Sequence, residues 1–116
     1  MKASRIPAAV LAALVAAAAV GAAAEPPVER IEASREGFRP DRLTLRKGEP
    51  VRIVLTSADG PHCFAVDAFR VEKRILPSRE TTIDLSPEEG GTFPFYCCLE
   101  KGAASERERG EIVVTE

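Results

Sequence analysis

Short segments in which apolar and polar residues alternate recur along the chain, and turn-forming residues separate them. The clearest is 51–56, where Val51, Ile53 and Leu55 would share one face of a strand. The segment 47–50, Lys-Gly-Glu-Pro, precedes it as a turn signal. Such signals return about every 8–12 residues, which is typical of an all-β sandwich. This spacing leaves no room for helices that would join parallel strands.

The alternation places the strands along the chain and suggests the limits of the domain. We expect a lead-in at 25–36, with an edge strand at 30–34, and one domain at 37–116. Residues 36–40 read as a turn with one buried aromatic side chain. The expected strands of the domain are 43–45, 51–56, 62–66, 71–76, 81–85, 93–98 and 111–115.

The first 24 residues have the pattern of a secretory signal peptide. Lys2 and Arg5 precede an alanine-rich apolar run that ends in three alanines before Glu25. We expect cleavage after Ala24, which would make the mature protein periplasmic or secreted, without a membrane span. The alternative is an uncleaved anchor, because the run approaches the minimum length of a span. Weakly apolar alanine and the acidic far flank favour cleavage.

The length and net charge of the chain limit the assembly and the kinds of partner that we expect. The 116 residues are enough for one small domain, which we expect to be a monomer. The net charge is −2, and acidic and basic residues are interspersed. That pattern is typical of a solvated surface and gives no nucleic-acid-binding patch.

The only histidine and one of three cysteines form a candidate metal site. Phe93, Phe95 and Cys97 fall on one face of a strand, so the strand would carry a thiol to the end of the core. His62 begins another strand, and we expect it beside Cys97. Thiolate and imidazole together suit copper or zinc.

A third ligand for such a site would come from Cys98, Cys63 or a carboxylate such as Glu100. A competing role for two of these residues is a disulfide between Cys63 and Cys98, because each follows a proposed ligand and exported thiols tend to pair. An odd number of cysteines leaves at least one free, metal-bound or paired between chains. Glu100, Glu106 and Glu108 lie in a mixed-charge loop that we expect to be solvated.

The sequence gives little support for catalysis. It contains no phosphate-binding glycine loop, no paired-carboxylate motif and no Cys-X-X-Cys. His62 and Cys97 resemble a nucleophile and base, but no third group to orient them can be named. We therefore expect a protein that is not an enzyme.

The order of these segments resembles the cupredoxin family, in particular the periplasmic EfeO-type cupredoxin-like proteins and the copper domain of cytochrome oxidase subunit II. The resemblance implies a Greek-key β-sandwich and one copper ion bound by His62 and Cys97. The family's ligand loop also supplies a second His and often a Met, and the loop at 98–110 contains neither. The segments that carry the resemblance are 37–40, 43–45, 47–51, 59–64 and 91–97.

Two functions follow as expectations. The first is an exported copper-binding protein for copper handling, or for electron transfer, with a redox or copper-transfer protein as partner. The second is a metal-free structural or interaction domain of the same fold, stabilised by a disulfide. The missing second His counts against electron transfer.

Overall fold

The computed structural model describes residues 25–99 and 106–116, which form nine strands and one short 3-10 helix. None of the helices in these two ranges is long and apolar enough to cross a membrane. The expected signal peptide at 1–24 lies outside the described residues. In chain order, the elements are β1 (Val28–Ser34), β2 (Gly37–Arg39), β3 (Arg42–Arg46), β4 (Val51–Ser57), β5 (His62–Val66), η2 (Asp67–Phe69), β6 (Val71–Ile75), β7 (Thr81–Leu85), β8 (Gly91–Tyr96) and β9 (Arg109–Thr115).

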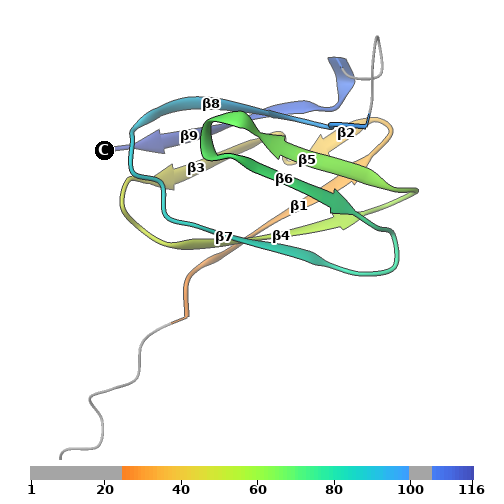
Figure 1. Cartoon of the computed structure of the whole chain (residues 1–116), viewed down its shortest axis with the longest axis horizontal. Helices are drawn as coiled ribbons and strands as arrows, with labels where there is room; N and C mark the ends of the chain where they lie inside the picture. The colour runs from red at the N-terminus through yellow and green to blue at the C-terminus, as the bar shows by residue number, and fades with distance from the viewer. Residues whose placement is uncertain (1–24, 100–105) are drawn as a thin grey trace, which may run out of the picture.

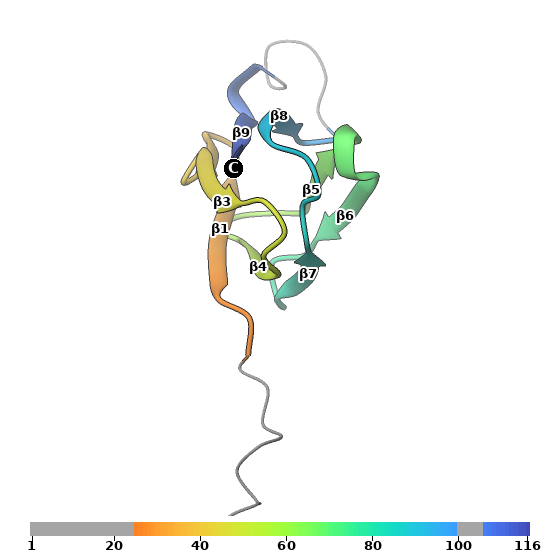
Figure 2. The same cartoon turned by 90° about the vertical axis from the view of Figure 1, so that its left-hand side faces the viewer.

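The strands form two sheets that enclose one core (Figures 1 and 2). One sheet has the order β2-β1-β4-β7, and the other has the order β3-β9-β8-β5-β6. Two parallel pairs, β1 with β4 and β3 with β9, join strands that are distant in the sequence. The prediction of an all-β sandwich is confirmed.

Strand β1 corrects the prediction of an edge strand at 30–34. It lies between β2 and β4 rather than at the edge of its sheet. Ile31 and Ala33 are fully buried, and Ile31 is in register with Leu55 of β4. Both edges of β1 are hydrogen-bonded to neighbouring strands, and residue alternation alone does not reveal such pairing. The expected turn at 36–40 contains strand β2, whose Phe38 is buried as predicted.

Three aromatic rings from different strands fill the core near the end of β8. Phe95 packs against Phe64 with ring centroids 4.9 Å apart and against Phe38 at 5.1 Å. Gly110 on β9 leaves the space that the Phe95 ring occupies, because a Cβ at this position would collide with the ring and with the Asp41 carbonyl group. This cluster holds the end of β8 against the start of β9.

The pairing of β5 with β8 determines which side chains meet at that end. The two strands are antiparallel, with Ala65 opposite Tyr96. Extending this register puts Cys63 opposite Cys98, and the structure joins these two residues in a disulfide with Cα atoms 5.1 Å apart. Because strand side chains alternate, His62 and Cys97 then share the core face with Phe64 and Phe95.

Candidate metal centre

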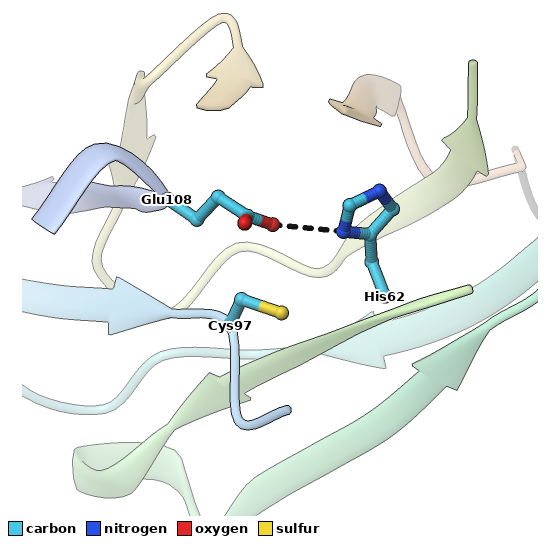
Figure 3. A group of neighbouring side chains, drawn as sticks. All are labelled: His62, Cys97 and Glu108. Carbon is cyan, nitrogen blue, oxygen red and sulfur yellow. Dashed lines mark ion pairs between the residues drawn. The ribbon is translucent and has the colours of Figure 1, made fainter. Parts of the chain in front are cut away.

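Three buried side chains converge at one end of the sandwich: His62, Cys97 and Glu108 (Figure 3). Their candidate ligand atoms all lie within 4.8 Å of one another. His62 begins β5, Cys97 follows β8 directly, and Glu108 directly precedes β9. Their exposed fractions are only 2%, 1% and 1%. An imidazole, a thiol and a carboxylate therefore share a site that bulk water barely reaches.

Backbone hydrogen bonds hold these segments together. The Cys97 N–H donates to the Glu108 carbonyl oxygen at 3.0 Å, which joins the end of β8 to the start of β9. The Cys63 N–H donates to Cys97 Sγ at 3.3 Å, which joins β5 to the same point. The Cys63–Cys98 disulfide adds a covalent link between the segments that carry His62 and Cys97. The positions of the three donors are thus fixed mainly by the backbone.

Asp59 orients the His62 ring from outside the cluster. His62 Nε2 lies 2.6 Å from Asp59 Oδ1, and the Asp59 carboxylate also accepts the backbone N–H groups of Arg35 and Gly60. The hydrogen bond from His62, followed by these two, holds the pKa of Asp59 well below its usual range. The ionised Asp59 carboxylate is an acceptor for a hydrogen bond from the Nε2–H tautomer of His62. That tautomer leaves the Nδ1 lone pair facing Glu108 and Cys97.

Two polar atoms inside the cluster lack hydrogen-bond partners. His62 Nδ1 and Glu108 Oε1 lie 2.8 Å apart, which makes an ion pair when the ring is protonated (Figure 3), but among the described residues neither atom has a hydrogen-bond partner. Buried polar atoms are normally hydrogen-bonded, so two buried ligand atoms that face one another without hydrogen bonds have the arrangement of a cation site. A cation bound between them would satisfy both atoms.

Burial also affects the third donor. Desolvation raises the pKa of the Cys97 thiol, and hydrogen bonds with the backbone of Leu99 and of Cys63 only partly oppose this. Without a cation, the thiol is therefore protonated at neutral pH. Since thiolate is the form that binds metal, a cation would displace this proton.

The structure brings His62 and Cys97 together, but the rest of the expected ligand set is different. Cys98 is bonded to Cys63 and is not available as a thiolate. Glu100 lies outside the described residues. Glu108 was expected on a solvated face, and that expectation was wrong. His62 is also buried, and its ring lies against the carboxylates of Asp59 and Glu108.

Comparisons with known proteins establish the family of the chain. A family model described as a cupredoxin-like domain matches residues 7–114, which is most of the chain. The chain belongs to the cupredoxin family. The resemblance noted in the sequence is thereby confirmed. This family member differs from the usual pattern in its loop at 98–110, which contains no His and no Met.

Among relatives, the chain is 35% identical over 72 residues to the alternative cytochrome c oxidase subunit 2 of Bradyrhizobium diazoefficiens. That alignment covers 62% of this chain and 26% of the relative, so the chain spans about a quarter of the relative's length.

Two solved structures share the cupredoxin fold. The periplasmic domain of subunit II of cytochrome oxidase (CoxB) of Bradyrhizobium japonicum has a TM-score of 0.69 at 17% identity, covering 78% of this chain and 84% of that one. The metal-binding domain of the Cu(I)-exporting P-type ATPase CopA of Streptococcus pneumoniae, solved with Cu(I), has a TM-score of 0.66 at 24% identity. It covers 82% of this chain and 93% of the other.

Glu108, the third member of the cluster, belongs to the loop at 98–110, in which the family usually has a second histidine and this chain has none. Glu108 is the last residue before the final strand, β9, which begins at Arg109. Sequence reasoning missed it because Glu106, Arg107 and Arg109 surround it with charge. The available signal was its place in the loop rather than its residue type.

Proposed function

We propose that this cupredoxin binds one copper ion through His62 Nδ1, Cys97 Sγ and the Glu108 carboxylate. The observation that carries the proposal is the convergence of three buried donors, two of which have unsatisfied atoms. Thiolate with imidazole suits copper or zinc, and copper would supply redox or transfer chemistry when bound. Membership of the cupredoxin family favours copper.

The donor set favours copper handling over electron transfer. Electron-transfer sites of the blue-copper type use two imidazoles and one thiolate in a trigonal arrangement. Here a carboxylate takes the place of one imidazole. We infer that the protein holds or delivers copper outside the cytoplasm, with a copper-transfer or redox protein as its partner. The periplasmic location of the related subunit II domain supports this compartment.

Anaerobic titration of the purified protein with copper tests the proposal. We expect one ion per chain, and we expect His62→Ala or Cys97→Ser to weaken binding by more than about 100-fold, since loss of an outer group alone costs about 10–100-fold. Glu106→Gln is the matched control, because this exposed carboxylate lies two residues from Glu108. Unchanged stoichiometry and affinity in both ligand variants would refute the site.

The orienting role of Asp59 gives a second prediction. Asp59→Asn removes the charge that accepts the Nε2 proton of His62, so we expect copper affinity to fall about 10–100-fold. In the metal-free protein, nitrogen-15 NMR of His62 should show the Nε2–H tautomer in the wild type and a mixture in the variant. A wild-type ring protonated at Nδ1 would contradict the assignment.

A metal-free structural or interaction domain is the second candidate function. The Cys63–Cys98 disulfide favours it, because a covalent link stabilises the fold whether or not a cation binds. The same titration discriminates between the two functions. An absence of copper binding in the wild type, with the disulfide intact, would select the metal-free domain.

A further inference from the structure

We propose that Glu108 makes this a site for a divalent cation, which binds Cu(II) or Zn(II) in preference to Cu(I). The inference rests on the proposed function and concerns the oxidation state of the ion that the site selects. It starts from the net charge of the three donors, one of which is the carboxylate of Glu108.

The bound donor set carries two negative charges. Cys97 contributes a thiolate, Glu108 a carboxylate and His62 a neutral imidazole. The proton of this imidazole is on Nε2, which donates a hydrogen bond to Asp59. A divalent cation would therefore give a neutral centre, and a monovalent cation would leave one net negative charge. Asp59 itself lies outside the donor set, where its side chain is 28% exposed to solvent and lies 3.9 Å from Arg35 Nε.

Because the site is buried, the net charge of the ion together with its ligands affects the free energy of binding. All three donors are at most 2% exposed. Uncompensated charge is costly in a site that water barely reaches, and a neutral combination of ligands and ion avoids most of that cost. With a second neutral histidine in place of Glu108, the same reasoning would favour a monovalent ion. The identity of residue 108 thus decides which oxidation state the site stabilises.

The chemical types of the donor atoms also favour a divalent ion. Cu(I) prefers soft sulfur ligands, whereas carboxylate oxygen is a hard donor that suits divalent ions. The disulfide withholds Cys63 and Cys98, so the described cluster offers a single thiolate. A site with one soft donor, one imidazole and one carboxylate matches Cu(II) or Zn(II) better than Cu(I).

Paired affinity measurements test the inference. Zn(II) and, under anaerobic conditions, Cu(I) are titrated by chelator competition into the full wild-type chain, Glu108→Gln and the control Glu106→Gln. We expect Glu108→Gln to weaken Zn(II) binding about 100-fold or more and Cu(I) binding less than about tenfold. The copper midpoint potential should rise with the ratio of Cu(II) to Cu(I) dissociation constants, by about 59 mV for each tenfold change.

The outcomes separate this inference from the proposed function. Equal losses for both ions in Glu108→Gln, with binding intact in the wild type, would overturn the charge argument alone. A wild type that binds neither ion would overturn both proposals. If Glu108→Gln does not fold, Glu108→His provides the neutral donor instead, and its Cu(I) affinity should exceed that of the wild type. A Cu(I) affinity at or below the wild-type value would count against the inference.

Discussion

Replacing Phe95 with alanine should lower the free energy of unfolding by about 3 to 5 kcal/mol, the usual cost of deleting a buried aromatic ring. The Phe95 ring is fully buried between Phe38 and Phe64 and against the backbone at Gly110. Neighbouring backbone on two strands limits how far this cavity can collapse. Urea-induced unfolding of the metal-free protein measures the loss.

Phe93→Ala is the matched control for this prediction. Phe93 lies on the same strand and packs against Phe69 with centroids 5.0 Å apart, but it is only partly buried. Its loss should therefore cost clearly less than that of Phe95. Equal losses in the two variants would contradict the central position of Phe95. Because Cys97 follows two residues later, Phe95→Ala should also weaken copper binding.

Removing the disulfide should have the second large effect. The double substitution Cys63→Ala and Cys98→Ala opens a link between residues that are 35 apart in the sequence. The chain-entropy relation for a loop of this size gives about 3 to 4 kcal/mol of lost stability. Chemical denaturation of the double variant and the wild type, both without reductant, measures the difference.

Two controls isolate the contribution of the disulfide. Cys97→Ser keeps the disulfide, so added reductant should destabilise it by about as much as it destabilises the wild type. The double variant should not respond to reductant. A wild type that is equally stable with and without reductant would show that this link does not stabilise the fold.

The strands could be predicted from the sequence because period-two alternation is a local property. Residues 51–55 carry it clearly, and they form β4 as expected. The interior position of β1 could not be predicted, because its parallel pairing with β4 depends on contacts between distant segments. Residue alternation specifies which side chains face inward but not which strands become neighbours.

The candidate site, too, could be predicted only in part from the sequence. The proximity of His62 and Cys97 was expected because each lies at the end of a strand that carries a core aromatic. Glu108 was missed because its neighbours in sequence are charged. Its burial arises from the hydrogen bond between the Cys97 N–H and the Glu108 carbonyl, and from the close approach of β9 to Phe95 at Gly110.

Anomalous X-ray diffraction at the copper edge, on crystals of the copper-loaded protein, gives the most direct test of the metal centre. We predict a single strong peak enclosed by His62 Nδ1, Cys97 Sγ and the Glu108 carboxylate. A peak bound by other residues, or a fully copper-treated crystal with no peak between these three side chains, would contradict the account.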